Sequence, residues 1–182
     1  MIFRKYRQTG NITSWVFVSL FVCGVSLFSS RFFFNSDTIF YIARRIGSLA
    51  DAANLLFHYD DRANFRPLTY GIASWLLVPV GGLHPWVYHL LAALIHCLNT
   101  YLAFLLARRL TGQKTTASLT AYFFGLHWVL FHATYGMVCL PDLSYVFFAL
   151  LSLLALCRSR ESDTFLWLPL SLMAFLAAFV VV

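Results

Sequence analysis

Residues 86–109 read WVYHLLAALIHCLNTYLAFLLARR, an apolar run that ends at two consecutive arginines. The apolar part, residues 86–107, is close to the ~20 residues that one helical crossing of a bilayer requires. Arg108 and Arg109 then close it, as basic residues often do at the cytoplasmic end of a membrane helix. The stretch therefore predicts a transmembrane helix.

The whole chain has the composition of a membrane protein. Of its 182 residues, 60% are hydrophobic and only 11% are charged, and the mean hydropathy is +0.75. A soluble domain carries about 25% charged residues, because it needs a solvated surface. The net charge of +6 is explained by basic residues at helix ends, so we expect membrane lipids and no nucleic acid as partners.

Four further apolar runs resemble the first, and we predict an all-α polytopic transmembrane helix bundle. The predicted crossings are at about 14–34, 86–107, 117–133, 143–156 and 164–182. Residues 35–84 are richer in charge and are interrupted by Pro and Gly, which favours an outer loop with interfacial (juxtamembrane) helices. Because the last run is still apolar at Val182, we expect residues 1–182 to be one N-terminal membrane region of a longer protein.

The basic residues predict the orientation of the bundle. Three clusters fall on the same side of the predicted crossings: Arg4, Lys5 and Arg7; Arg108, Arg109 and Lys114; Arg158 and Arg160. Such clusters are typical of cytoplasmic segments. The N-terminus is therefore predicted to be cytoplasmic, and 35–84 and 136–142 to face the periplasm or the ER lumen.

Neither the cysteines nor the histidines have the spacing of a metal site. No two of the four cysteines have the sequence spacing of a metal knuckle or a redox pair, and we interpret them as small apolar residues: Cys23, Cys97, Cys139 and Cys157. The six histidines show no zinc-binding spacing. We expect them to form hydrogen bonds across helices instead.

Charged groups at the outer face are the candidates for chemistry. Asp37 begins the outer loop and Asp142 stands at the membrane end of an apolar helix. Two such carboxylates suit a general base or a divalent-cation site, so a cation is a candidate cofactor. The alternative is that Asp37 is an N-cap and Asp142 a helix N-terminal charge. Arg66, before Pro67, suits a lipid phosphate, or it simply reaches toward lipid headgroups.

Several short motifs occur in a characteristic order. They are FRPLTY at 65–70, GLHPWVYHL at 82–90, HCLN at 96–99, LLARRLTG at 105–112, FGLHW at 124–128 and LPDL at 140–143. Together they resemble the start of GT-C glycosyltransferases, and most closely the protein O-mannosyltransferase-like enzymes. Three motifs depart from the family. Phe65 stands where aminoarabinose-transferring relatives place a metal-binding Glu, Asp37 follows Ser36 where many members have an acidic pair, and His127-Trp128 stands where His-Pro or Asp-Pro is commoner.

The resemblance implies a membrane glycosyltransferase that moves a sugar from a polyprenyl-phosphate carrier to an acceptor on the non-cytoplasmic face. By it, Asp37 is the catalytic base, Asp142 helps to organise the site and Arg66 contacts the lipid-linked phosphate. Asp60, Asp61 and His89 complete our set of substrate-binding candidates. The family has many more helices, so we expect this region alone to be inactive. The alternative function is a non-catalytic membrane scaffold or a transporter fragment, in which the outer Asp and Arg residues only pair with one another.

Overall fold

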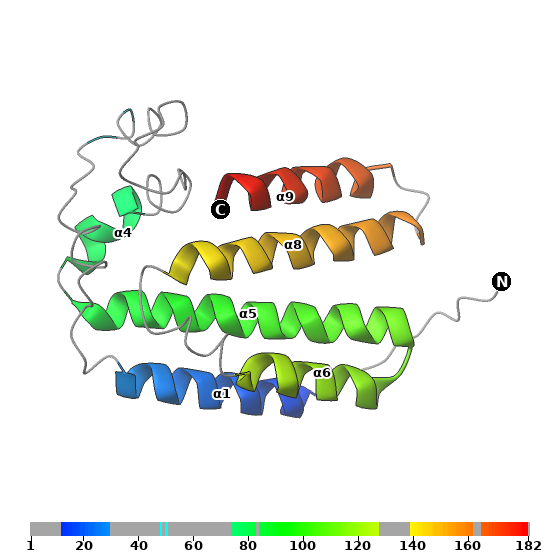
Figure 1. Ribbon diagram of the computed structural model, residues 1–182, viewed down its shortest axis with the longest axis horizontal. Coiled ribbons are helices and arrows are strands. Elements are labelled where there is room, and N and C mark those ends of the chain that lie inside the picture. The colour runs from blue at the N-terminus through cyan, green and yellow to red at the C-terminus, as the bar shows by residue number, and fades with distance from the viewer. Residues whose placement is uncertain are drawn as a thin grey trace.

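The protein is described by a computed structural model, in which every regular element among the described residues is a helix (Figure 1). The predicted all-α class is therefore confirmed for this part of the chain. The described residues are 12–29, 48, 50, 74–82, 84–127, 139–161 and 165–181. The helices are α1 (Ile12–Ser29), α4 (Ser74–Gly81), α5 (Pro85–Thr111), α6 (Lys114–Leu126), α8 (Leu140–Ser159) and α9 (Trp167–Val181).

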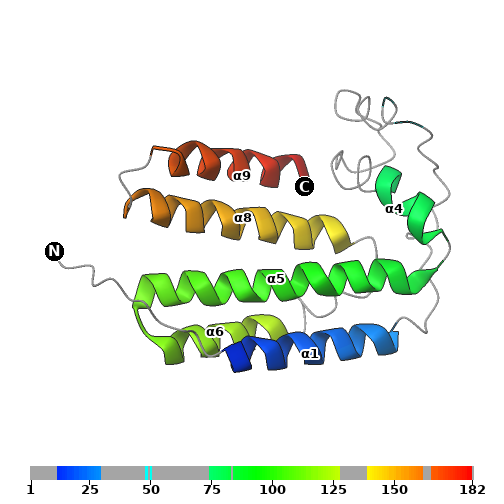
Figure 2. The ribbon, with the colours of Figure 1, turned by 180° about the vertical axis from the view of Figure 1, so that it is seen from behind.

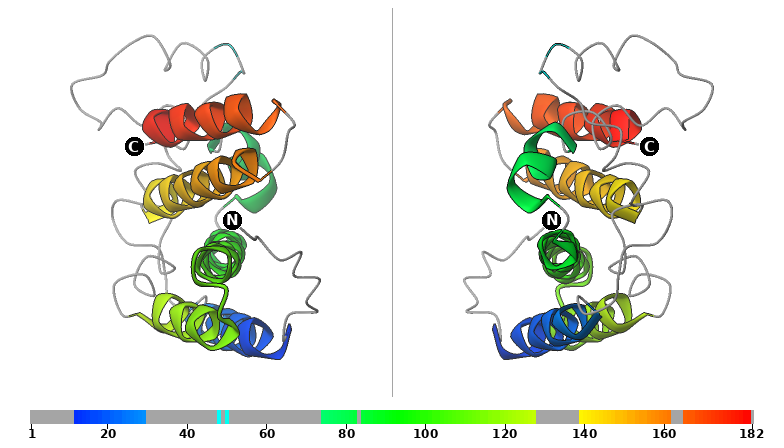
Figure 3. Two further views of the ribbon diagram at one scale, coloured as in Figure 1. Left: turned by 90° about the vertical axis from the view of Figure 1, so that its right-hand side faces the viewer. Right: turned by 90° about the vertical axis from the view of Figure 1, so that its left-hand side faces the viewer.

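Helix α5 lies at the centre of the arrangement. It packs against α1, α4, α6 and α8, while α9 packs on the far side of α8. Figure 3 shows the resulting order: α9, then α8, then α5, with α1 and α6 together beyond it. The colours in Figures 1 and 2 show that α1, α6 and α9 run in the direction opposite to α5 and α8. Apart from the short helix α4, the described helices thus alternate in direction along the chain.

Local sequence sets both ends of α5. Pro85 takes the first position, where a missing N–H costs nothing. At the other end, Gly112 adopts a left-handed conformation (φ 69°) and its N–H bonds to the carbonyl of Arg108 at 2.9 Å. This is the glycine C-cap that commonly ends a helix. The helix therefore continues past the two arginines to Thr111.

Within the described part of the chain, two helices are long and apolar enough to cross a membrane, α5 with 27 residues and α8 with 20. At 1.5 Å per residue α8 is about 30 Å long, which matches the hydrocarbon thickness of a bilayer. Only 28% of its most apolar window is buried by the rest of the described structure. Large apolar side chains such as Leu153 and Leu156 face outward, as expected where lipid is the solvent.

The other helices are shorter than the crossings predicted around them. Helix α1 has 18 residues, α9 has 15 and α6 has 13. Helix α6 ends at Leu126, and residues 128–133 of that predicted crossing lie outside the described part, as do 30–34 of the first. Most of the predicted outer loop 35–84 is also outside it. Helix α4, with eight residues, is too short to span a bilayer.

A glycine allows α6 to pack tightly against α1 and α5. A Cβ added to Gly125 would overlap the Cγ1 of Val18 in α1 and would lie 3.1 Å from the Cγ2 of Thr100 in α5. Small residues commonly allow such close approach between membrane helices. Ala117 and Ala121, two further small residues of α6, are fully buried. The α1–α5–α6 contact therefore depends on residues that lack bulk.

Candidate functional site

Of the six candidate site residues, the structure describes two. Asp142 lies in the first turn of α8 and is exposed. A carboxylate is stabilised there by the positive end of the helix dipole. His89 lies in α5 and is buried, with 6% of its surface exposed. Asp37, Asp60, Asp61 and Arg66 lie outside the described residues, so their assigned roles and any meeting with Asp142 stay predictions.

The N-terminal parts of α5 and α8 pack against each other through residues that flank Asp142 in the sequence. Leu140 and Leu143 of α8 are 3% and 1% exposed, and they form one apolar cluster with Tyr88 and Ala92 of α5. Asn99 of α5 adds a polar contact, since its side-chain Nδ2 donates to the carbonyl oxygen of Leu143 at 2.8 Å. The first turn of α8 is therefore held by α5 through both packing and a hydrogen bond.

Tyr88 joins this end of α5 to the turn that follows α4. Its hydroxyl donates to the carbonyl oxygen of Gly82 at 2.9 Å. Its ring also lies against Gly81, where an added Cβ would meet the ring at 3.1 Å. Gly82 itself has φ 51°, a conformation that glycine adopts without strain. One tyrosine thus fixes the short helix α4 against the end of the bundle that carries Asp142.

His96 forms the cross-helix hydrogen bond expected of a histidine in this chain. It is fully buried, and its Nε2 lies 3.0 Å from the carbonyl oxygen of Gly125. Because a carbonyl only accepts, Nε2 carries the proton. Gly125 lies in the last turn of α6, whose carbonyls have no partner within the helix. His96 therefore stabilises the end of α6, and it also stacks on the ring of Phe124 at 5.9 Å.

Two buried polar atoms of α5 have no hydrogen-bond partner among the described residues. They are His96 Nδ1 and Asn99 Oδ1, three positions apart on the helix. The neighbouring Thr100 differs, since its hydroxyl donates to the carbonyl of His96 on its own helix at 2.9 Å. Leaving a buried polar group without a partner costs about 1–3 kcal/mol. Burying His96 and Asn99 in α5 is therefore unfavourable in itself, and apolar residues of the same volume would avoid this cost.

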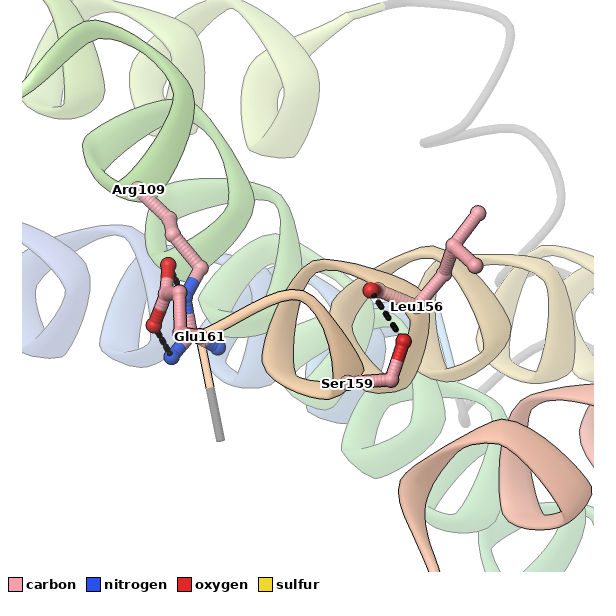
Figure 4. A network of polar contacts seen from close by, with 4 residues as sticks. All are labelled: Arg109, Leu156, Ser159 and Glu161. Carbon is pink, nitrogen blue, oxygen red and sulfur yellow. Dashed lines mark hydrogen bonds and ion pairs between the residues drawn. The ribbon is translucent and has the colours of Figure 1, made fainter. Parts of the chain in front are cut away.

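The opposite end of the bundle is basic. Helices α5 and α8 both carry Arg in their last turn. Figure 4 shows Arg109 and Glu161 joined by two parallel hydrogen bonds, of 2.9 and 2.6 Å. Arg158 lies 5.5 Å from the ring centroid of Trp167 in α9, within the range of a cation–π contact. Aromatic and basic residues together are typical of a membrane–water interface.

The structure offers no metal site within the residues it describes: no group of three or more His, Cys, Asp or Glu side chains there could hold an ion. Of the two carboxylates suggested as cation ligands, only Asp142 belongs to that part of the chain. The candidate cation therefore remains a hypothesis about the outer loop.

Asn99 is the residue near the candidate site that the sequence did not reveal. An amide in an apolar run, three positions after His96, is itself a signal, because burying it in a membrane helix needs a partner. Its partner lies 44 positions away. No local pattern predicts that distance.

The long apolar helices, with much of their surface facing outward, are those of a membrane protein. The chain is similar to protein O-mannosyl-transferase TMTC2 of Mus musculus, with 31% identity over 116 residues, which are 62% of this chain and 14% of the relative. The same protein of Homo sapiens is also 31% identical over 116 residues. That of Xenopus laevis is 33% identical over 110 residues, 60% of this chain and 13% of the relative.

This partial similarity supports a relationship with protein O-mannosyltransferases. The chain spans only about one seventh of the length of these relatives. Comparison with known protein families gives no match, and neither does comparison with solved structures.

Proposed function

We propose that this chain is part of a membrane glycosyltransferase of the GT-C class. It would transfer a sugar from a polyprenyl-phosphate-linked donor to an acceptor on the non-cytoplasmic face of the membrane. The relatives' name, protein O-mannosyl-transferase, favours a mannosyl or similar hexosyl donor. The relatives are much longer than this chain, so residues beyond the similar region would complete the donor and acceptor sites.

The observation that carries the proposal is the separation of charge along α8. Asp142 lies in its first turn and Arg158 in its last, about 24 Å apart along the axis. Basic residues favour the cytoplasmic side, so Asp142 would stand at the outer side, where a lipid-linked sugar would present its head group. Helix α5 runs parallel to α8 (Figure 1) and ends in Arg108 and Arg109 at the same basic end.

The proposed chemistry divides three tasks among outer residues. Asp37 would accept the proton of the attacking hydroxyl, since a general base is needed there. Arg66 would stabilise the leaving lipid phosphate through charge-assisted hydrogen bonds. Asp142 would organise the site, while Asp60, Asp61 and His89 would bind the substrate. Because His89 is buried, its contact with the substrate would come from within the bundle.

Transfer by the intact protein in reconstituted membranes, with a polyprenyl-phosphate-linked mannose as donor, tests the proposal. Asp37→Asn should lower the transfer rate by about 10²–10⁴-fold, the usual contribution of a general base. Insertion into the membrane, measured by resistance to carbonate extraction, should be unchanged. Asp51→Asn, an outer-loop carboxylate without an assigned role, is the matched control and should retain activity.

The donor-binding role of Arg66 has its own measurement. Arg66→Ala should raise the donor KM by about 10–100-fold, the range expected for a lost charge-assisted hydrogen bond. Arg62→Ala, four positions earlier in the same loop, is the control. An unchanged KM would contradict the phosphate role of Arg66. Absence of transfer by the unmodified protein, with its lipid-linked donor present, would favour a non-catalytic scaffold or transporter.

A further inference from the structure

Burying the amide side chain of Asn99 costs free energy, and packing alone does not explain why an amide occupies this position. It lies near the middle of α5, in an apolar run, and is 0% exposed. Burying an amide without full compensation costs a few kcal/mol, and Asn99 Oδ1 has no partner among the described residues. An alanine or leucine would avoid this cost. What Asn99 gains in return is the bond to Leu143 in α8.

That bond reaches the turn on which Asp142 stands. Leu143 follows Asp142 directly and its side chain is buried in the cluster with Tyr88 and Ala92. The N–H groups in the first turn of a helix lack partners within the helix, so this turn frays readily. A hydrogen bond to the carbonyl of Leu143 opposes fraying from the buried side. An ordered first turn also fixes the backbone position of Asp142 on its exposed side.

We propose that Asn99 is a positioning residue, which holds Asp142 in place by bonding the first turn of α8 from within the bundle. The hydrogen bond from Asn99 to Leu143 is sufficient to support the positioning of the turn. Its consequence for catalysis rests on the function proposed above for Asp142.

The reactivity of the native thiol of Cys139 reports on how well this turn is ordered. It is the residue immediately before α8 and is partly exposed. In the intact protein, reconstituted in nanodiscs, Asn99→Leu removes the hydrogen bond at similar side-chain volume. The reaction rate of Cys139 with a maleimide should then rise several-fold. Cys157, near the other end of α8, should react at its original rate.

Thr100→Val is the matched control. Thr100 is the next residue, is equally buried, and its hydroxyl bonds only within α5 in the described structure. Its loss should leave the reactivity of Cys139 unchanged. An unchanged Cys139 rate in Asn99→Leu would overturn the proposal, as would an equal rise in Thr100→Val. If Asn99→Leu does not fold, Asn99→Ser serves in its place, because a serine hydroxyl can bond its own helix as Thr100 does.

The catalytic consequence is measured separately. In the transfer assay, Asn99→Leu should lower kcat by about 10–100-fold, as small misplacements of reacting groups do, with the donor KM unchanged. A raised donor KM with constant kcat would contradict a positioning role. Absence of transfer by the unmodified protein would refute the proposed function instead, while the Cys139 rates would still decide whether Asn99 holds the turn.

Discussion

Ser152 of α8 and Ser171 of α9 bond each other reciprocally. The hydroxyl of each donates to the backbone carbonyl of the other at 2.9 Å, and the two Oγ atoms lie 3.2 Å apart. Both side chains are buried, at 8% and 6% exposure. Most other large side chains of α9 face outward, so this pair is the main polar link between the two helices in the described structure.

The serine pair predicts a measurable coupling energy. In a double-mutant cycle with Ser152→Ala and Ser171→Ala, the coupling should be about 0.5–1.7 kcal/mol, the range found for polar contacts between membrane helices. Unfolding in bicelles by steric trapping gives the free energies required. Ser159→Ala is the control, because that hydroxyl donates only to Leu156 in its own helix (Figure 4). A coupling near zero would contradict the reciprocal bond.

Gly125→Ala should destabilise the bundle, because the added methyl group would overlap Val18 and crowd Thr100. Overpacking of this kind costs about 1–3 kcal/mol. The melting temperature of the purified protein reports the loss, and Val18→Ala should restore part of it by making room. Gly24→Ala in α1 is the control, because nothing lies within 4 Å of its added Cβ. If both glycine variants melt alike, the predicted close approach of α6 and α1 is wrong.

Oxidation should join Cys23 of α1 to Cys97 of α5. Their Sγ atoms lie 4.0 Å apart, so a small movement brings them to bonding distance. With copper–phenanthroline as catalyst, the two thiols would lose two electrons to dioxygen and two protons to solvent. A protein that retains only these cysteines should lose maleimide labelling after denaturation. One that retains only Cys97 and Cys157 should keep its labelling; loss there too would show that the reaction ignores the predicted packing.

Local end signals explain why α5 and α8 are longer than the crossings predicted for them. Residues 86–107 were predicted and α5 spans Pro85–Thr111, since Gly112, and not the arginine pair, caps the helix. Residues 143–156 were predicted and α8 begins at Leu140, because Pro141 and Asp142 are both favourable in a first turn. The position of Asp142 at a helix start was therefore readable from the chain.

What the sequence could not predict is which helix faces which. The bond from Asn99 to Leu143 and the approach of Gly125 to Val18 join residues far apart in the chain, and hydrophobic patterning is weak in helices that are apolar all round. His89 is buried, as expected of histidines in this chain, but the helix that covers it could not be predicted for the same reason. A histidine in an apolar run can face lipid, a neighbouring helix or a site, and only packing distinguishes these.

We propose that the Asp142 end of the bundle faces the non-cytoplasmic compartment and that the basic end faces the cytoplasm. Both ends offer an exposed position for a thiol, at Asp142 and at Arg160. In a protein without its native cysteines, Asp142→Cys and Arg160→Cys place one reactive group at each end. Neither substitution changes a buried side chain.

Labelling with a membrane-impermeant thiol reagent, in sealed vesicles of known orientation, determines which compartment each end of the bundle faces. We predict that Asp142→Cys reacts only from the non-cytoplasmic side and Arg160→Cys only from the cytoplasmic side. Labelling of both from one side, or of Asp142→Cys from the cytoplasm, would contradict it, because the proposed site would then lie on the wrong face of the membrane.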